Sequence, residues 1–238
     1  MKIEFYEEFP TSQNLRKLKL IKFKTKLFIA ASNLKEFQNL EKKVKAINKK
    51  IECAYWPTVK NSYWISPFSD TKDLDKLFEE LDSCKNKILI DLEFPKNLIL
   101  FFKNLLKFKH NQKLIENFLR KNAERITTAQ NPLFSAQPLG INYPVNLEKG
   151  LMWYSSVCIW PLNSIIKRML KKLKNKENYN IALGTIAKGI YGIEPILKPE
   201  GLERDLEFVK KAGFKKVTIF RLGGLDKQYI SVLNKYIR

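Results

Sequence analysis

The sequence predicts a (β/α)₈ TIM barrel, in which eight parallel strands alternate with helices around one core. Short β-rich runs alternate with helical patterns from one end of the chain to the other, which is typical of parallel βα units. Eight such runs are present, and no GxGxxG follows the first of them. The length of 238 residues suits one barrel domain over residues 1–238. An open, doubly wound parallel sheet is the alternative, because strand order cannot be deduced from the sequence.

Each predicted strand is a short run rich in β-branched and aromatic residues. The eight runs cover residues 2–8, 26–32, 51–56, 87–93, 125–130, 151–156, 180–185 and 216–222.

Between these runs, apolar residues recur at three- and four-residue steps, which predicts amphipathic helices. Two stretches depart from the pattern. Residues 94–122 hold one long helical segment, or two helices that meet near 107–111, and residues 131–149 contain three prolines. Long connections after barrel strands usually lie over the active face.

The chain is lysine-rich and carries a formal net charge of +20. A basic surface attracts phosphates, but only seven of the 44 basic residues are arginine, the side chain whose planar fork dedicated phosphate-binding sites favour. Most of the lysines fall on the polar faces of the predicted helices. We therefore expect no nucleic-acid partner.

The first residues and the cysteine usage predict a cytoplasmic protein. Carboxylates interrupt the amino-terminal stretch where a signal peptide would be apolar, and no segment is apolar enough to span a membrane, so we expect no membrane partner. Three separated cysteines and a single histidine, His110, argue against a zinc site and a Ser-His-Asp triad. No pattern predicts the oligomeric state.

Polarity assigns the two faces of the fourth predicted strand. Apolar Ile88 and Ile90 suit the helix layer, which turns Asp91 and Glu93 into the barrel at the carboxyl end, where barrel active sites lie. In the first strand the same alternation turns inward the side chains Glu4, Tyr6 and Glu8.

Carboxylates crowded together raise one another's pKa, and this is what general acid/base catalysis at neutral pH requires. We predict Glu93 as the general acid/base, with Asp91 and Glu8 as the other catalytic carboxylates. The plain alternative is that such acids, Glu4 and Glu52 above all, pair with lysines at the barrel rim. Oxygens of the three catalytic candidates could also hold Mg²⁺, but their spacing requires no metal or cofactor.

Other strand ends supply groups that suit a sugar. Trp56 and Tyr154 could stack on a ring, with Tyr6 beside them, and the amides of Gln130 and Asn131 could bind hydroxyls. The tryptophan could equally pack under the loop that follows its strand.

Two glycine-bearing turns follow the seventh and eighth strands, where many barrels bind a phosphate. They contain Gly184-Thr185 and Gly223-Gly224, and Arg221 precedes the second. Glycine is also the ordinary residue for a turn with positive φ.

The Asp-x-Glu pair Asp91-Leu92-Glu93 and the Met-x-Tyr of Met152-Trp153-Tyr154 resemble motifs of chitinase-like barrel glycosidases. The resemblance implies that Glu93 is the proton donor, that Asp91 orients an acetamido group of the substrate, and that Tyr154 helps to hold it. The chain departs from that family at Leu89, where a further acid is expected. It also departs at Arg221, where a tryptophan would form the floor of the sugar site.

These observations predict a carbohydrate-active enzyme that hydrolyses or otherwise processes a glycosidic bond. A separation of about 5 Å between the carboxyls of Glu8 and Glu93 would suit a retaining reaction, and roughly 6.5–9.5 Å an inverting one. Two alternatives remain: a lyase or isomerase whose phosphorylated substrate is held by the glycine turns, with Arg221 nearby, and a non-catalytic barrel that binds a small molecule or carbohydrate.

Overall fold

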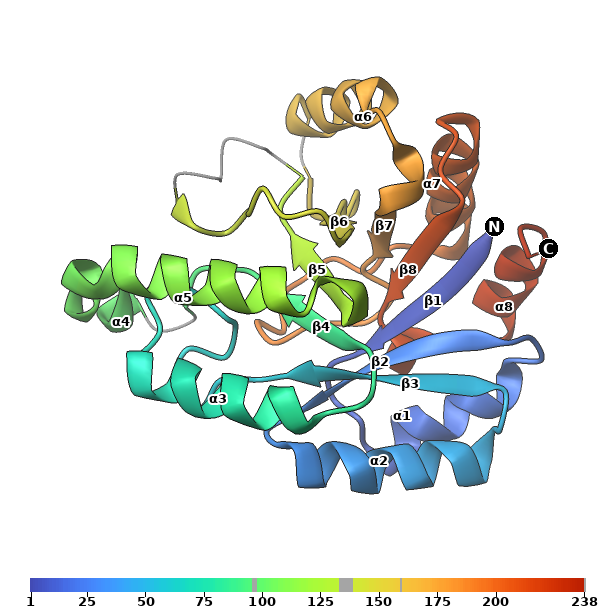
Figure 1. Ribbon diagram of the computed structural model, residues 1–238. Coiled ribbons are helices and arrows are strands. Elements are labelled where there is room, and N and C mark those ends of the chain that lie inside the picture. The colour runs from blue at the N-terminus through green and yellow to red at the C-terminus, as the bar shows by residue number, and fades with distance from the viewer. Residues whose placement is uncertain (96–97, 133–138, 159, 238) are drawn as a thin grey trace.

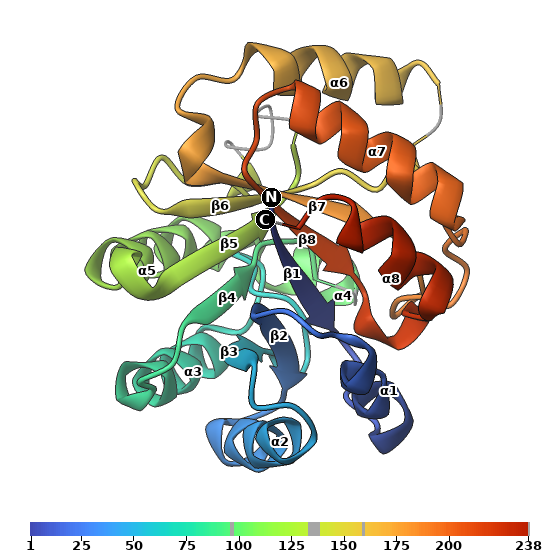
Figure 2. The same ribbon diagram turned by 90° about the vertical axis from the view of Figure 1, so that its right-hand side faces the viewer.

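The computed structural model describes residues 1–95, 98–132, 139–158 and 160–237. Its strands are all parallel and close a barrel in sequence order, so the predicted (β/α)₈ fold is confirmed (Figures 1 and 2). The strands are β1 (Lys2–Glu7), β2 (Thr25–Ala31), β3 (Ile51–Pro57), β4 (Ile88–Asp91), β5 (Ile126–Gln130), β6 (Glu148–Met152), β7 (Tyr179–Gly184) and β8 (Lys216–Phe220).

Two strands differ from their predicted bounds in ways that matter for the site. β6 begins three residues earlier than expected and ends at Met152, because the chain then turns and the amide of Val157 donates to the carbonyl of Tyr154. β4 ends at Asp91, so Glu93 lies two residues beyond the ladder. Both Tyr154 and Glu93 therefore belong to connections that leave the barrel at its carboxyl end.

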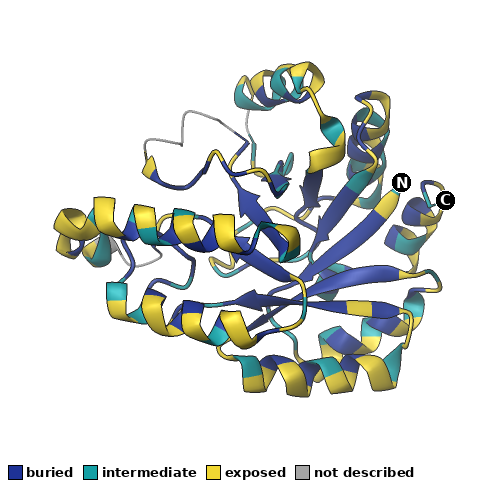
Figure 3. Cartoon of the chain, in the orientation of Figure 1, coloured by how far each residue is buried: buried dark blue, intermediate teal, exposed yellow. Residues whose placement is uncertain are grey.

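The helices surround the barrel, with their exposed sides outward and their buried sides on the strands (Figure 3), where apolar side chains form the core. They are α1 (Ser12–Arg16), α2 (Leu34–Ile47), α3 (Thr71–Ser83), α4 (Leu98–Lys103), α5 (Phe108–Lys121), α6 (Leu162–Lys172), α7 (Pro199–Lys211) and α8 (Lys227–Asn234). Side-chain caps fix several starts: Asn33, Asp70 and Asp226 each accept a hydrogen bond from a first-turn amide.

The long segment before β5 is two helices, α4 and α5, separated by residues 104–107. The connection from β5 to β6 has no α-helix in its described residues, 131–132 and 139–147. None of the helices in the described ranges combines the length and apolarity that crossing a membrane requires.

Alternate strand residues form two separate cores. One core lies between the strands and the helices and contains, for example, Ile3 and Phe5 of β1. The other fills the barrel interior and contains Tyr6, Phe28, Trp56, Leu89 and Phe220, among other side chains. A residue's parity in its strand thus decides whether it can reach the barrel interior.

Candidate active site

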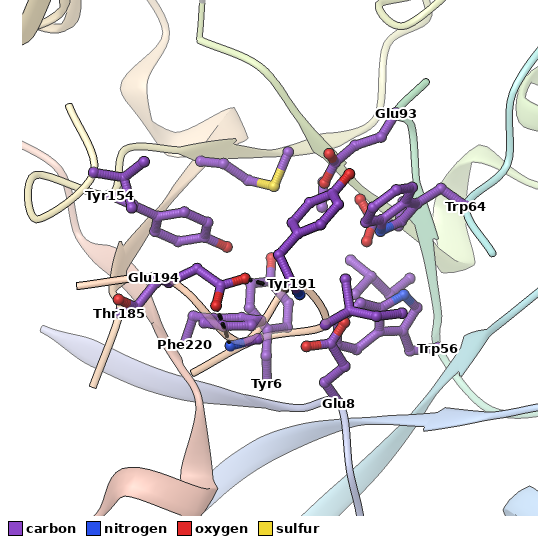
Figure 4. Close-up of a pocket in the computed structure, with 17 residues that line it drawn as sticks. Tyr6, Glu8, Trp56, Trp64, Glu93, Tyr154, Thr185, Tyr191, Glu194 and Phe220 are labelled. Atoms are coloured by element: carbon purple, nitrogen blue, oxygen red, sulfur yellow. Dashed lines mark hydrogen bonds between the residues drawn. The ribbon is translucent and has the colours of Figure 1, made fainter. Parts of the chain in front are cut away.

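A cavity of about 250 Å³ opens at the carboxyl ends of the strands (Figure 4). Its walls combine carboxylates with aromatic rings. The acids are Glu8, Asp91, Glu93 and Glu194; the aromatic residues are Tyr6, Trp56, Trp64, Tyr154, Tyr191 and Phe220. The predicted catalytic carboxylates therefore share one cavity with three of the predicted substrate-binding residues.

Strand alternation brings three of the acids together. In β4, Ile88 and Ile90 pack in the helix-facing core, and this turns Asp91, with Glu93 beyond it, into the cavity. Glu8 follows the last residue of β1 and has the same parity as Tyr6, so its side chain also enters the cavity. In Figure 4, Glu8 and Glu93 reach in from opposite sides of the view.

These carboxylates have little compensation from the protein. No lysine, arginine or histidine is among the described residues that line the cavity. The hydroxyl of Tyr63 donates to Oε1 of Glu8 at 2.9 Å, but Oε2 of Glu8 and Oδ1 of Asp91 are buried and have no hydrogen-bond partner in the described part of the chain. Buried polar atoms in this condition usually have a role that involves another molecule.

Burial and mutual repulsion shift the titration of the acids upward. Burial raises the pKa of Glu93 to about 7, and the charge of Glu8 adds to this effect. Burial likewise raises the pKa of Glu8 to about 7, although the hydrogen bond from Tyr63 and the positive charge of Arg221 oppose the rise. The pKa of Asp91 lies well above its usual range, first because of burial and then because of Glu93 and Glu8. At neutral pH the cluster therefore holds protons that it can donate.

The aromatic residues come from strands on several sides of the barrel. Tyr6 lies between Phe28 and Trp56, with ring centroids 5.4 and 5.7 Å away. Tyr154 lies 5.4 Å from Phe220, the last residue of β8. Gly150 makes room for Tyr6, because a Cβ at that position would stand 3.0 Å from its hydroxyl oxygen. The result is a cavity with largely apolar walls and a few polar groups, as ligand sites generally have.

The connection from β7 to α7 supplies cavity residues that the sequence did not indicate. The ring centroids of Tyr191 and of Trp64, which belongs to the β3–α3 connection, are 5.8 Å apart, so the two rings pack together at the cavity. The carboxylate of Glu194 accepts hydrogen bonds from the amides of Gly189 and Tyr191, at 3.1 and 3.2 Å, and this shapes the loop. Residues 185–198 have no periodic pattern, so no strand or helix signal could have placed these side chains.

Three predicted substrate-binding residues do not line the cavity. Gln130 is buried with the parity opposite to Ala129, which does line it, and accepts a hydrogen bond from Thr128 instead. Asn131 is exposed and lies outside the lining. Arg221 is ion-paired with Glu7 at 2.9 Å and donates to the carbonyl of Lys188.

The predicted position of Arg221 was wrong because β8 turns Phe220 into the barrel instead. Val217 and Ile219 pack in the helix-facing core, and Arg221 continues their side of the strand. That alternation is visible in the sequence and is the signal that could have identified Phe220. An aromatic ring thus does come from the end of β8, as the family pattern expects of a tryptophan.

The glycine turns do not form a free phosphate site. The amide of Gly223 donates to Oε2 of Glu7 at 2.6 Å, and the amide of Gly224 donates to the carbonyl of Arg221. Following Gly184, the amide of Thr185 donates to the hydroxyl of Ser156, although the Thr185 side chain does line the cavity. A carboxylate, a carbonyl and a hydroxyl of the protein therefore already accept the hydrogen bonds of these three amides, and this argues against the predicted phosphate site.

No group of three or more His, Cys, Asp or Glu side chains is arranged to hold a metal ion in the part of the chain that the structure describes.

No protein-family model matches the sequence, and no curated protein sequence matches it. Solved structures do match the fold. A GH18 chitinase from Pseudoalteromonas aurantia has a TM-score of 0.61 at 12% identity, with all of both chains covered. The class V chitinase from Nicotiana tobaccum has a TM-score of 0.59 at 10% identity, with 99% of both chains covered. The chitinase-like agglutinin from Robinia pseudoacacia has a TM-score of 0.56 at 7% identity, with 98% of this chain and 99% of that chain covered. The chain therefore has the barrel fold of these chitinases and of the chitinase-like agglutinin, at 7–12% sequence identity.

Proposed function

We propose that the barrel is a carbohydrate-active hydrolase that cleaves a glycosidic bond, with Glu93 as the general acid/base. The observation that carries the proposal is the cluster of Glu8, Asp91 and Glu93 in an aromatic-walled cavity without a basic lining residue in the described chain. Glycosidases use a pair of carboxyls in this way: one protonates the leaving oxygen, and the other either activates the water that attacks the anomeric carbon or attacks that carbon itself to form an intermediate that water then hydrolyses.

The titration of the acids supports these roles. A Glu93 carboxyl with a pKa of about 7 is partly protonated at neutral pH, so it can give its proton to the glycosidic oxygen as the C–O bond breaks. Glu8 shares the negative charge of the cluster and is the candidate for the second carboxylate. The unpartnered Oδ1 of Asp91 is available to the substrate, in line with the orienting role that the chitinase resemblance implies.

The aromatic side chains supply the binding surface. Trp56, Tyr154 and Phe220 present rings to the cavity, and sugar rings carry apolar C–H faces that pack on such surfaces. The structural similarity to chitinases supports a carbohydrate as the ligand class.

The test is hydrolysis of a panel of 4-methylumbelliferyl glycosides of hexoses and N-acetylhexosamines. We expect the Glu93→Gln variant to lose about 10²–10⁴-fold in kcat/KM, the usual contribution of a general acid. Glu52→Gln is the matched control, because that side chain is 60% exposed and lies near the start of β3. A Glu93→Gln variant as active as the wild type would contradict the proposal.

A carbohydrate-binding protein without activity is the second candidate, and the similarity to an agglutinin favours it. A non-catalytic barrel is expected to have no open cavity at the strand ends and to have its inward acids paired with lysines. Here a cavity is open, and no lysine of the described chain lines it beside the acids. Isothermal titration with saccharides that the wild type binds distinguishes the two, since a pure binding protein would show binding without hydrolysis.

A further inference from the structure

The exposed apolar side chains of this protein are concentrated at one end of the barrel. In the described chain, all the large apolar residues that are exposed lie in connections that follow β4, β5, β6 and β7, or in the first turn of α6. We call this set the apolar rim: Phe94, Ile99, Phe102, Leu105, Leu106, Leu139, Val157, Trp160, Ile165, Tyr191, Ile193 and Ile196. These connections leave the carboxyl ends of β4 to β7, on one side of the cavity end of the barrel, and both termini lie at the opposite end (Figures 1 and 2).

α4 and the turn after it form the most prominent part of the rim. Phe101 holds this segment to the barrel by packing 4.3 Å from Phe68, and the buried Asn104 donates to the carbonyl of Phe68 at 3.0 Å. The outer side of the segment remains apolar: Phe102 is 74% exposed and Leu106 is 99% exposed. Large apolar side chains displayed together in this way mark an interaction surface.

The two sequence segments that contain most of the rim carry charges of one sign, although acids line the adjoining cavity. No acidic residue occurs in residues 94–115 or 149–176 of the sequence, and these two segments contain most of the rim. Lys103, Lys107 and Lys109 are exposed beside the apolar side chains of α4 and its turn. The lateral helices differ, since α2 and α3 carry acids as well as lysines. In the β7–α7 connection, the single acid Glu194 is hydrogen-bonded to its own loop.

From this combination we propose that the apolar rim binds the surface of a membrane rich in anionic phospholipids. Exposed apolar side chains enter the boundary between headgroups and acyl chains, while lysines stay at the phosphate level, and an exposed tryptophan such as Trp160 suits the same depth. The contact is peripheral and needs no membrane-spanning helix. The proposal therefore departs from the expectation of no membrane partner, which considered membrane-spanning segments only.

The charge also argues against a second copy of the chain as the occupant. Two rims facing each other would bring the same lysines together in a protein whose net charge is already +20, and residues 94–115 and 149–176 contain no acids to pair them. An anionic surface is the complement that the rim lacks. The proposal does not depend on the glycosidase activity.

Co-sedimentation of the full chain with vesicles tests the proposal. We expect binding to vesicles of equal phosphatidylglycerol and phosphatidylcholine, at least tenfold weaker binding to phosphatidylcholine alone, and weaker binding at high salt. The double substitution Phe102→Ser with Leu106→Ser removes apolar side chains that are exposed, so the fold should persist, as circular dichroism can verify. We expect it, and separately Lys103→Glu with Lys107→Glu, to reduce binding about tenfold or more.

The matched control is Lys24→Glu with Lys49→Glu, which changes two exposed lysines at the other end of the barrel. This control should bind like the wild type. Absence of binding to the anionic vesicles would overturn the proposal, as would an equal loss in the control, which would indicate unspecific attraction. The proposal would also be overturned if the Phe102→Ser, Leu106→Ser variant bound the anionic vesicles as tightly as the wild type. Concentration-dependent dimerisation that this variant abolishes, without vesicle binding, would assign the rim to self-association instead.

Discussion

Glu4 of β1 and Glu8, which directly follows that strand, show how differently one barrel can treat the same side chain. Glu4 and Glu8 have the same parity and both point into the barrel, one at the amino-terminal end and the other in the cavity. Glu4 is fully buried, yet Lys2 lies 2.7 Å and Lys26 3.6 Å from its carboxylate, and Asn180 donates to it at 3.0 Å. Among the described residues, Glu8 has a single hydrogen bond, from Tyr63, and it shares its surroundings with other acids.

The difference separates an acid with compensating partners from one without them. A buried carboxylate with cations and donors around it can hold neighbouring strands together. A carboxylate that is buried among acids resists ionisation and makes the folded state less stable at high pH, which proteins tolerate mainly where function needs it. The amino-terminal end of the barrel interior therefore compensates its buried acid, whereas the carboxyl end, where we propose the active site, leaves its acids largely uncompensated.

The largest effect should come from disturbing the acid with compensating partners. Glu4→Gln would leave Lys26, whose side chain is only 7% exposed, with Glu52 at 4.0 Å as its remaining partner among the described ion pairs. We expect a loss of about 3 kcal/mol in the free energy of unfolding, because a buried cation is left without its main partner. Urea denaturation measures it. A loss below about 1 kcal/mol would show that Lys26 reaches water and that the two ends differ less than we infer.

The pH dependence of catalysis comes next in size. If Glu93 must be protonated to act, kcat/KM should fall about tenfold per pH unit above its pKa of about 7, hence about a hundredfold at pH 9. A series of pH–rate profiles measures this, with Glu52→Gln as a variant that should leave the profile unchanged. An alkaline limb near pH 4–5 instead would mean that the cavity does not raise the pKa of the catalytic acid.

The smallest effect should be a gain in stability that depends on pH. The pKa of Glu8 is about 7 in the folded protein and about 4.5 when unfolded, so its ionisation costs stability as the pH rises between these values. Glu8→Gln removes that cost. We expect the variant to be more stable by about 2 kcal/mol at pH 8 and unchanged below about pH 4.5.

Thermal melting at both pH values checks this prediction. Glu4→Gln serves as the opposite case on the same strand, since it should be destabilised at pH 8. Equal melting temperatures of Glu8→Gln and the wild type at pH 8 would show that Glu8 ionises freely.

The fold was predictable because βα alternation repeats along the whole chain and each strand's apolar residues show which side faces the helices. That rule located Asp91, Glu93 and Glu8 correctly on the cavity side. It gave no guidance in β5, where Thr127 and Thr128 are adjacent and both polar, and Gln130 was consequently placed on the wrong side. The catalytic roles of Asp91, Glu93 and Glu8 stay predictions.

Other parts of the site follow from contacts that the sequence does not encode locally. Arg221 was chosen for its charge, although its partner is Glu7, more than two hundred residues away in the chain. Tyr191 and Glu194 lie in a loop whose shape depends on hydrogen bonds from the loop's own amides. Such long-range and irregular contacts leave no periodic signal.

The barrel wall also has one thin seam. β2 and β3 share seven register pairs, whereas β3 and β4 share only the pair Tyr55–Ile88 among the described residues. Farther along, the amide of Ile65 bonds to the carbonyl of Asp91. Local opening in native-state hydrogen exchange should therefore begin here, with the amide of Ile65 exchanging before those of β2. A ligand that bridges Glu8 and Glu93 would span the seam, and its binding should be seen as slower exchange along β4.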